Sequence, residues 1–553
     1  MMITTYFILI FSFISSVIMP DDSREAAQEA HYFDWNNATV YFLMTDRFYN
    51  GDTSNDINFN RTAKTSDLRG FRGGDIKGIT KKIEAGYFTE LGVDVIWLSP
   101  VMEQIHACVD EGQGNTYAYH GYWTRDWTAM EPNFGTTADL HELMRVAHKN
   151  NIRIMLDVII NHTGPVTPKD PLWPSDWVRT QPQCTYQDAE TTISCTLVEN
   201  LPDILTNQTK EVALPENLIK KWKDEGRLQE ELDELELFFN DTNYPRTPRY
   251  YIIKWLTDFI REFGIDGFRV DTVKHTEADV WDDLAKEAAR AFEQWQEEKQ
   301  EAIQKGQEFF MLGEVYNYNV LSGTDFDFGD RKVNYFENGF NSLINFGFKG
   351  DAHKSYEVLF SEYSEQINSE AFEGITVMNY VSSHDDSHPF DADRERPFES
   401  AIKLLLAPGM AQIYYGDEVA RPLKIEGARG DANLRGMMPW DRQKNNDLLA
   451  HWQKLGRFRH QHPSIGAGKH ICISTSPYAF VRTYVKGNQF DRVLIGLDLP
   501  KTSFTLNLQG YFNDGELLFD RYNEVYYPVK NGSLEIKTET GIVLLERTAP
   551  GLR

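Results

Sequence analysis

Several acidic residues of this chain directly follow short apolar runs that have the composition of buried β-strands. In the stretch GIDGFRVDTVKH, residues 264–275, the apolar run ends at Asp271, and Arg269 lies two residues before it. Similar runs end at Glu314 and close to Asp385. One acid at a strand end is often only solvated. Three such acids, with an arginine beside one of them, could carry out acid–base or nucleophilic chemistry.

The rest of the chain contains elements that could bring these acids together. From about residue 40, short apolar runs alternate with amphipathic helical stretches, a pattern that predicts parallel β/α units. The candidate strands are VYFLMTDRF, VDVIWLSP, IRIMLDVII, IDGFRVD, EFFMLGEVY, SLINFGF, ITVMNYVSSHD and MAQIYYGDE. Eight strands with interleaved helices predict an α/β fold, a (β/α)₈ TIM barrel, whose strands converge at their carboxyl ends on one mouth.

Two segments interrupt this alternation. A long insertion rich in Pro, Thr and Trp follows the third strand and contains one acidic helical run at 220–239; a connection of that length is typical of a functional segment or a small domain. Towards the end, short strands with turn signals predict an antiparallel β-domain. The predicted division is a barrel at 36–161, an inserted domain B at 162–248, the rest of the barrel at 249–463 and a C-terminal β-sandwich domain at 464–553.

The strand ends predict which side chains meet at the barrel mouth: Asp46, Asp157, Asn161, His162, Asp271, Glu314, His384 and Asp385. Glycoside hydrolysis requires a carboxyl pair of this kind, one group ionised and one protonated. Like charges held close raise the pKa of one partner and so divide the two roles. Arg269 points to the same face of its strand as Asp271 and can hold that carboxylate ionised. Asp157 is expected to brace the site without reacting.

Composition and charge narrow the classes of partner. The chain has 553 residues, a net charge of −27 and a pI of about 5.0, so its surface should repel phosphate backbones, and no nucleic acid is expected as a partner. An aromatic content of 13% suits carbohydrate, whose flat apolar ring faces stack on aromatic side chains.

The first twenty residues, MMITTYFILIFSFISSVIMP, predict a signal peptide at 1–20. Their apolar core is too short to span a bilayer comfortably, and the alternative to a cleaved signal peptide is an uncleaved anchor. No other apolar run approaches 18 residues, so no stable membrane association is expected, and the protein is predicted to be exported to the periplasm or the medium. In such an oxidising compartment, Cys184 and Cys195 in their Thr-rich loop could form a local disulfide.

Four stretches, in the expected order on the expected strands, resemble the α-amylase family, glycoside hydrolase family 13. They are DVIINH (157–162), GFRVDTVKH (267–275), GEVY (313–316) and VSSHDD (381–386). Supporting similarities are YAYHGYW (117–123), LPDI (201–204) and YYGDE (414–418). The resemblance extends over roughly residues 38 to 550. Stretches such as NNATVYFLMTDRFYNGD are most similar to the periplasmic-type bacterial members.

This resemblance implies roles for individual residues. Asp271 matches a nucleophile that forms a covalent glycosyl intermediate, Glu314 a general acid/base, and Asp385 a third acid that holds sugar hydroxyls. Retention of the α-anomer follows if the first two carboxyl groups lie roughly 5–5.5 Å apart. The positions that match substrate-binding residues are His120, Tyr122, His162, Arg269, Lys274, His384, Asp431 and Arg435. Of these, Tyr122 would be the stacking platform, and Asp431 with Arg435 would bind a more distant sugar.

The chain departs from the family pattern at one place in the seventh-strand motif. Ser383 occupies the position that usually holds Asn, and a second acid, Asp386, follows Asp385. Because His384 and Asp385 are both present, this difference is not expected to remove activity. It could change how the loop is held or which sugars fit.

The resemblance also implies one or two Ca²⁺ sites. In the family a calcium ion clamps the insertion onto the barrel, and the matching ligands are Asn161, Asp203 and the backbone carbonyl of His275. A second set resembles an N-terminal calcium loop of cyclodextrin-forming members; it comprises Asn50, Asp52, Asn55, Asp56, Gly73 and Asp75. On spacing alone, those Asp and Asn residues could equally form ordinary Asx-turns.

The leading functional hypothesis is an exported, monomeric, endo-acting hydrolase of α-1,4-glucosidic bonds in starch, glycogen or maltodextrins. One alternative is an α-glucan transglycosylase or cyclodextrin-type enzyme, which would form the same intermediate but use a sugar as acceptor. Another is a non-catalytic glucan-binding protein on the same barrel. Proteins of that last kind typically lose one of the three acids, whereas this chain retains all of them.

Overall fold

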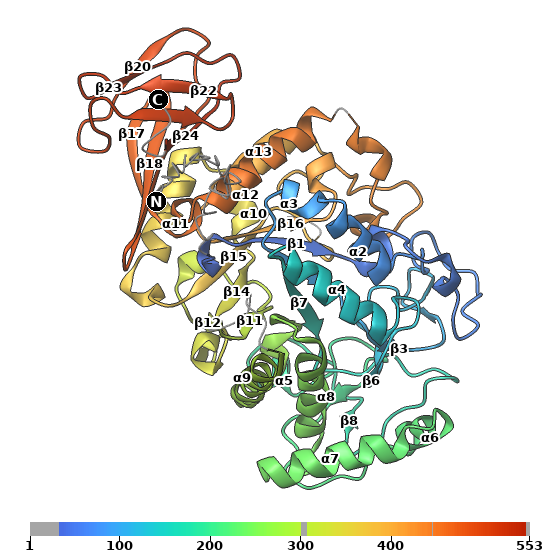
Figure 1. Cartoon of the computed structure of the whole chain (residues 1–553). Helices are drawn as coiled ribbons and strands as arrows, with labels where there is room; N and C mark the ends of the chain where they lie inside the picture. Colours follow the sequence, from blue (N-terminus) through green and yellow to red (C-terminus); the bar gives the residue numbers. More distant parts are fainter. Residues whose placement is uncertain (1–32, 300–306, 387, 445, 549–553) are drawn as a thin grey trace, which may run out of the picture. The chain divides into compact units, whose positions relative to one another are not determined.

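A computed structural model describes residues 33–299, 307–386, 388–444 and 446–548, and the predicted signal peptide at 1–20 lies outside them. Eight parallel strands close into a barrel in the order β1–β16–β15–β14–β11–β10–β7–β2, which confirms the predicted TIM barrel and all eight candidate strands (Figure 1). Their bounds are β1 Thr39–Leu43, β2 Val95–Leu98, β7 Arg153–Val158, β10 Gly267–Val270, β11 Phe310–Gly313, β14 Ser342–Asn345, β15 Thr376–Tyr380 and β16 Met410–Tyr414.

Burial on both faces explains why these strands have apolar sequences. Every residue of the eight barrel strands is buried, because one face fills the barrel and the other packs against helices. The register pairs Arg269 of β10 with Asp157 of β7 on one side and with Leu312 of β11 on the other. This parallel register brings the ends of the three strands to the same level, where the acidic residues follow.

The helices around the barrel begin and end with recognisable sequence signals. α4 (Thr137–Lys149) starts with a capping box between Thr136 and Asp139. α8 (Pro248–Phe263) has proline in its first turn and ends at Gly264, which adopts a left-handed φ of 72° and leaves no room for a Cβ against Trp295. The remaining helices flanking the strands are α1 Thr45–Phe48, α2 Ile76–Glu84, α3 Tyr87–Glu90, α9 Asp279–Lys299, α10 Phe348–Asp351, α11 Tyr356–Ile367, α12 Pro397–Leu405, α13 Asp447–Gln461 and α14 Ser464–Ala467.

The insertion after β7 differs from its prediction in one respect. The expected single acidic helix is two helices, α6 (Glu216–Asp224) and α7 (Leu228–Thr242), because Gly226 between them has a left-handed φ of 78°. The insertion also contains β8 (Val178–Arg179), α5 (Glu190–Ile193) and β9 (Asp203–Ile204). In Figure 1 its helices lie at the opposite end of this view from the C-terminal strands.

A second excursion, between β2 and β7, was not predicted from the sequence. It contains the antiparallel pairs β3 (Met102–Gln104) with β6 (Thr124–Met130) and β4 (Val109–Asp110) with β5 (Asn115–Thr116). Asp126 of β6 accepts ion pairs from Lys221 and Arg227 of the insertion, both at 2.8 Å. The two excursions are therefore held together by buried charges.

The C-terminal segment forms the predicted antiparallel β-structure. A six-stranded sheet has the order β17–β18–β19–β24–β21–β22, and a two-stranded sheet joins β20 to β23. Leucine, valine and aromatic side chains from both sheets share one core. The bounds are β17 Lys469–Thr475, β18 Tyr478–Lys486, β19 Gln489–Leu497, β20 Phe504–Asn507, β21 Leu517–Asp520, β22 Val525–Pro528, β23 Ser533–Ile536 and β24 Val543–Arg547; of these, β17, β21 and β22 were not predicted.

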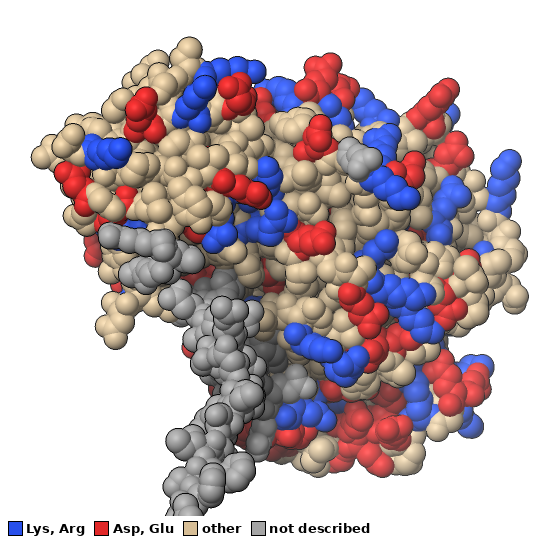
Figure 2. All heavy atoms as spheres, turned by 45° about the horizontal axis from the view of Figure 1, so that its top comes forward, with Lys and Arg blue, Asp and Glu red and all other residues tan. Residues whose placement is uncertain are grey.

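The charged surface is mixed in sign on the face seen in Figure 2, where lysine and arginine are interspersed with aspartate and glutamate. Among the described residues, none of the helices combines the length and the apolar character that crossing a bilayer would require.

Candidate active site

The carboxyl ends of β7, β10 and β11 continue their hydrogen-bond ladder beyond the last strand residues. The Asp271 N–H donates to the carbonyl of Val158 at 3.0 Å, and the Glu314 N–H donates to the carbonyl of Val270 at 2.9 Å. These backbone bonds place the two acids on neighbouring strands at the same edge of the barrel, as the sequence predicted. Both side chains are buried.

Arg269 is the centre of the carboxyl cluster. Its Nη1 lies 2.7 Å from Asp271 Oδ1 and 2.9 Å from Asp157 Oδ1, and its Nη2 lies 2.9 Å from Glu314 Oε1. One guanidinium thus holds three carboxyl groups, where the sequence had suggested only the contact to Asp271. The guanidinium makes this possible because its nitrogens are fixed in one plane and can each bind a different carboxyl group. A lysine side chain has only one nitrogen at its end.

Asp157 is held on every side and has no open face for substrate. Besides Arg269, it accepts hydrogen bonds from Trp97 Nε1 at 3.1 Å and from the Tyr122 hydroxyl at 2.8 Å. Its exposed fraction is 0%. These contacts agree with the expectation that Asp157 braces the site.

A strained residue positions Glu314. Thr272 adopts a left-handed φ of 52°, which is unfavourable for a β-branched side chain, and its N–H donates to Glu314 Oε2 at 3.0 Å. The carbonyl of Glu314 in turn accepts from the N–H of Val273 at 3.0 Å. The turn after β10 therefore fixes both the main chain and the carboxyl group of the neighbouring acid.

The third acid, Asp385, approaches the cluster from the loop after β15. Its side chain is 38% exposed, unlike those of Asp271 and Glu314. Ser383 Oγ lies 3.4 Å from Asp385 Oδ1, so the serine that departs from the family pattern is placed beside the same acid. Asp386 turns away into a buried contact with Lys349 and the Tyr380 hydroxyl, and it fastens the loop to β15.

The electrostatics separate the acids. Burial raises the pKa of Glu314 to about 8, and the charges of Asp271 and Asp385 add to the increase against the opposing effect of Arg269. Burial also raises the pKa of Asp271, to about 6; the nearby Arg269 lowers it, but less than burial raises it. Between these two values Glu314 holds a proton while Asp271 is ionised. Arg269 thus favours the ionised form of Asp271, in the direction that the sequence suggested, but it does not offset the effect of burial on the pKa.

Asp385 and the surrounding histidines complete this division. Desolvation favours the neutral form of Asp385, but the positive charges of Arg269 and Arg435 help to lower its pKa, so Asp385 is ionised. Burial lowers the pKa of His384 to about 3 and that of His162 to about 4. Both imidazoles are therefore neutral near pH 7 and can exchange hydrogen bonds with sugar hydroxyls without adding charge.

Four of the predicted substrate-binding residues lie together around Tyr122. Tyr122, His120 and His384 form a layer, because the Tyr122 ring stacks on His384 at 5.3 Å and on His120 at 5.8 Å. His162 Nε2 contacts the carbonyl of Tyr122 at 3.1 Å. Lys274 lies on the other side, where its Nζ donates to the carbonyl of Tyr316, a half-exposed residue two positions after Glu314.

Asp431 and Arg435 form an ion pair at 2.5 Å, and Arg435 Nε also donates to the carbonyl of His384 at 3.0 Å. The pair therefore supports the loop that carries Asp385. Arg69, which no sequence pattern singled out, is buried and lies 2.7 Å from Asp431 Oδ1. Only the folded chain reveals this contact, because 362 residues separate its partners.

Asp46 does not join the catalytic cluster. It lies in α1, pairs with Arg47 at 3.1 Å and accepts the backbone N–H groups of Arg72 and Gly73. The expectation that it would meet the other strand-end acids was wrong, because β1 ends at Leu43 and the chain turns into a helix before Asp46. Its role here is to hold the segment at residues 72–74.

The N-terminal oxygen cluster contains atoms that lack a partner. Asn50 Oδ1 and Asn55 Oδ1 are buried and accept no hydrogen bond from the described residues. Asn50 Nδ2 lies 2.8 Å from Asp56 Oδ1, and a Cβ added at Gly73 would collide with both groups. Unpaired buried oxygens are costly unless a cation or water meets them, so this part of the cluster fits a hard cation.

The other two predicted members of that cluster are already engaged. Asp75 caps α2 through the Gly78 N–H and accepts two further backbone N–H groups, while Asp52 caps a short turn and pairs with Lys77 at 2.6 Å. They shape the loop around Asn50, Asn55 and Asp56. The spacing of acids alone could not distinguish the two kinds of role.

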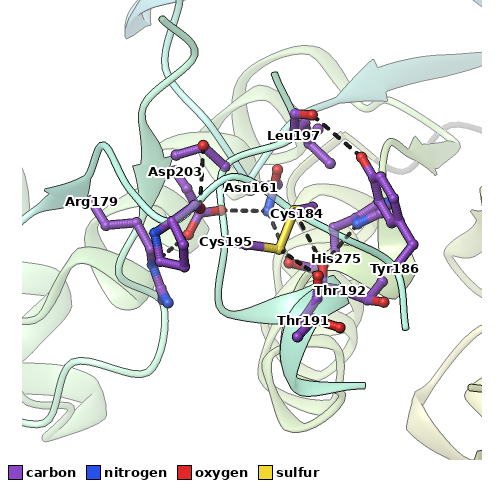
Figure 3. Close-up of a disulfide and its surroundings, with 12 residues drawn as sticks. Asn161, Arg179, Cys184, Tyr186, Thr191, Thr192, Cys195, Leu197, Asp203 and His275 are labelled. Carbon is purple, nitrogen blue, oxygen red and sulfur yellow. Dashed lines mark hydrogen bonds and ion pairs between the residues drawn. A yellow bond between two sulfur atoms is a disulfide. The ribbon is translucent and has the colours of Figure 1, made fainter. Parts of the chain in front are cut away.

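The cluster predicted between insertion and barrel has a different character. Asn161 Nδ2 donates to Asp203 Oδ1 at 2.8 Å and to the carbonyl of His275 at 2.9 Å, so the three predicted ligands do meet (Figure 3). The second oxygen of Asp203 lies 2.7 Å from Arg179 Nε. Across the described residues, no group of three or more acidic, histidine or cysteine side chains is arranged around a common metal position.

The expected disulfide lies beside this second cluster. Cys184 and Cys195 are joined, as predicted, and close a loop against which His275 packs (Figure 3). His275 Nδ1 donates to the carbonyl of Thr192 in that loop at 3.0 Å. The loop is thus linked to the residue that lies four positions after Asp271.

Comparison with known proteins decides the family. The protein family described as "Alpha amylase, catalytic domain" matches residues 42–446, which is most of the chain. The chain belongs to the α-amylase family. It is 34% identical over 511 residues to the periplasmic α-amylase of Escherichia coli K12, covering 82% of this chain and 71% of that protein. A cyclomaltodextrin glucanotransferase of Geobacillus stearothermophilus is 26% identical, covering 90% of this chain and 65% of that protein.

Among solved structures, the α-amylase of Geobacillus thermoleovorans, crystallised with acarbose, superposes with a TM-score of 0.65. Its sequence is 22% identical, and the match covers 94% of this chain and all of that one. At this identity the likeness concerns the fold. It extends the α-amylase architecture from the barrel through the C-terminal strands.

Proposed function

We propose that this member of the α-amylase family is an endo-acting, retaining hydrolase of α-1,4-glucosidic bonds in starch, glycogen or maltodextrins. The observation that carries the proposal is that the guanidinium of Arg269 binds both Asp271 and Glu314. The raised pKa of Glu314 keeps that residue protonated, so it can serve as the acid. The 34% identity to a periplasmic α-amylase over most of the chain supports the choice of substrate.

The first step of the proposed reaction breaks the glycosidic bond. Glu314 gives its proton to the bridging oxygen as that oxygen leaves, and Asp271 attacks the anomeric carbon to form a glycosyl ester. Positive charge develops on the ring, and ionised Asp385 together with Arg269-bound Asp271 faces it. In the second step, Glu314 takes a proton from water, which displaces Asp271 and restores the α-configuration.

The geometry favours direct attack over inversion. Because Asp271 and Glu314 bind adjacent nitrogens of the same guanidinium, their carboxyl groups are near neighbours. Inverting enzymes need a wider gap, about 6.5–9.5 Å, to place a water between the acids. The shared guanidinium therefore favours the narrower spacing of about 5–5.5 Å that retaining enzymes use.

The substrate contacts follow from the layer around the acids. Tyr122 would stack on the sugar at the cleavage position, with the neutral imidazoles of His120, His162 and His384 around it. Lys274 lies beside Glu314 on the leaving-group side, and Asp431 with Arg435 would meet a sugar on the opposite side. Arg435 also donates to the His384 carbonyl, so a sugar there would act on the loop that carries Asp385.

Transglycosylation is the second candidate, and the 26% identity to a cyclomaltodextrin glucanotransferase favours it. Both activities share the first step and differ in whether water or a sugar hydroxyl displaces Asp271. The acceptor would meet Lys274 and Tyr316, the latter 50% exposed beside Glu314. We place hydrolysis first because the hydrolytic relative is more similar and more evenly matched in length.

We further propose one Ca²⁺ at the N-terminal cluster, held by Asn50, Asn55, Asp56 and the main chain at Gly73. A bound ion would supply charge for the two buried amide oxygens and would order the loop ahead of α2, with no part in bond cleavage. Export is proposed from the sequence at 1–20 and from the periplasmic relative. The division at residues 161, 248 and 463, and a monomeric state, likewise remain proposals.

Proton NMR of maltoheptaose during its first minutes with the enzyme tests the function. The proposal predicts new α-reducing ends and short linear products. Products longer than the substrate, or rings without reducing ends, would favour transglycosylation. Initial β-anomers would contradict the roles given to Asp271 and Glu314. Glu314→Gln is the matched control, and unchanged cleavage by it would remove Glu314 from the mechanism.

A further inference from the structure

The antiparallel pair β8–β9 brings an arginine directly against a predicted calcium ligand. In this register Arg179 is opposite Asp203, and Val178 is opposite Ile204. The two side chains form an ion pair across the strands, with Arg179 Nε 2.7 Å from Asp203 Oδ2. Asp203 is buried and the Arg179 side chain is only 16% exposed, so water screens this pair weakly (Figure 3).

The oxygens that calcium would use in this cluster already face groups of the chain itself, although Asp203 Oδ2 and Arg179 Nε meet at 2.7 Å as an ion pair without hydrogen-bond geometry. The Asn161 amide nitrogen, not its oxygen, faces the cluster and donates to both Asp203 Oδ1 and the His275 carbonyl. Its own oxygen lies 3.3 Å from His162 Nδ1. A calcium ion needs six to eight oxygens, so it could enter only if the Asn161 amide turned round.

The cluster already contains a cation, the guanidinium of Arg179. One carboxylate, Asp203, faces one guanidinium, Arg179, and the other predicted ligands are a neutral amide and a carbonyl. Glu277, the other acid whose charge acts on Asp203, is held by the Thr206 hydroxyl at 2.5 Å. A divalent ion bound by Asp203 would place two further positive charges beside the guanidinium of Arg179, and like charges repel most strongly where water screens them weakly.

We propose that the guanidinium of Arg179 takes the place of a structural calcium ion and clamps the insertion onto the barrel. Through Asp203 and Asn161, Arg179 is linked to the carbonyl of His275, four residues after Asp271. From the other side, Thr192 in the disulfide-closed loop accepts from the imidazole of the same His275. Arg179 is a positioning residue in this scheme, and the cluster takes no calcium while its side chain is present.

The test uses the full chain with the N-terminal cluster disabled by Asp56→Ala, so that calcium bound elsewhere does not obscure the result. Bound calcium is measured by mass spectrometry of metal content after desalting, and thermal unfolding is followed in chelator and in millimolar calcium. Arg179→Gln is then added to this background. The matched control is Arg125→Gln, since Arg125 has 18% side-chain exposure and pairs with buried Asp170 at 2.5 Å, away from Asp203.

With Arg179 present, we expect the Asp56→Ala chain to hold no stoichiometric calcium and to unfold at the same temperature in chelator and in calcium. Adding Arg179→Gln should lower the melting temperature by about 5 °C in chelator, because it strands a buried carboxylate. Calcium should then restore much of that loss. Arg125→Gln should lose stability by a similar amount and recover none of it with calcium.

Three results would overturn the proposal. One is stoichiometric calcium in the Asp56→Ala chain, with a lower melting temperature in chelator. Another is a melting temperature unchanged by Arg179→Gln. The third is a loss that calcium restores no better than in the Arg125→Gln control. If Arg179→Gln fails to fold, the metal content and chelator response of Asp56→Ala alone still decide the question.

Discussion

Two arginines near the barrel mouth hold carboxylates, and they differ in how much charge they balance. Arg269 contacts Asp157, Asp271 and Glu314, so one cation faces three acids. Arg179 forms an ion pair with one carboxylate of the described residues, that of Asp203. In both clusters the carboxylates are buried, so depth does not distinguish them.

The difference in charge balance distinguishes a catalytic cluster, around Arg269, from a structural one, around Arg179. Around Arg269 the acids exceed the cation, and burial therefore raises the pKa of Glu314 to about 8 and of Asp271 to about 6. Such groups exchange protons near neutral pH, as acid–base catalysis requires. Around Arg179 one guanidinium pairs with one carboxylate, that of Asp203, at 2.7 Å. That arrangement can hold two segments together but offers no proton to transfer.

The largest effect should come from Asp271→Asn. The amide keeps the shape of the side chain but cannot attack the anomeric carbon, so turnover should fall at least about 10⁴-fold. Because the variant removes one of three acids around one cation, the melting temperature should not fall. Steady-state kinetics on maltoheptaose and thermal unfolding measure the two quantities. A stable variant that retains near-normal turnover would contradict the nucleophile assignment.

Asp203→Asn should show the opposite balance of effects. It leaves the Arg179 guanidinium buried without its carboxylate, which costs about 3–5 kcal/mol in comparable buried pairs. The expected result is a melting temperature lower by several degrees, with a smaller loss of turnover than in Asp271→Asn. Calorimetry and the same kinetic assay check it. Equal losses of turnover in the two variants would remove the distinction between the clusters.

Chelation should act through the N-terminal cluster and leave the Arg179 cluster unaffected. An ion present at 100 times its dissociation constant stabilises the folded chain by about 2.7 kcal/mol, so excess chelator should lower the melting temperature modestly. Asp56→Ala should abolish this response. A response that survives Asp56→Ala would indicate a metal elsewhere, and an unchanged melting temperature in the wild type would count against the proposed ion.

The pH dependence should reflect only the Arg269 cluster. Asp271 must be ionised, so kcat/KM should rise as pH increases through about 6, its pKa in the folded chain. Glu314 must be protonated, so kcat/KM should fall as pH increases through about 8. Each limb should approach a tenfold change per pH unit. Residual activity of Glu314→Gln that still declined near pH 8 would assign the alkaline limb to another group.

The sequence predicted the parts of the fold that depend on local patterns. All eight barrel strands were found, because strands buried on both faces have continuous apolar sequences. The C-terminal strands β17, β21 and β22 were missed, since their half-exposed residues lack that signal. The helix expected at 220–239 is two helices, because the turn at Gly226 interrupts an otherwise helical composition.

The acids of the site were predictable because each follows a strand, whereas their partners were not. The contact of Arg269 with Glu314 spans neighbouring strands, and that of Arg69 with Asp431 joins residues far apart in the chain. Arg179 had no sequence signal either, since its role depends on the register of a two-residue strand pair. Asp46 illustrates the opposite error, in which a strand-end acid turns away into a helix.

The most direct test of the account is to trap the covalent intermediate. A fluorinated α-glycosyl fluoride reacts through its good leaving group, and its ring fluorine slows hydrolysis of the ester that forms. Mass spectrometry of the intact chain and of its peptides then locates the sugar. The account predicts one sugar per chain, on the peptide that contains Asp271, and none in Asp271→Asn. An active enzyme that carries the label on another residue would contradict it.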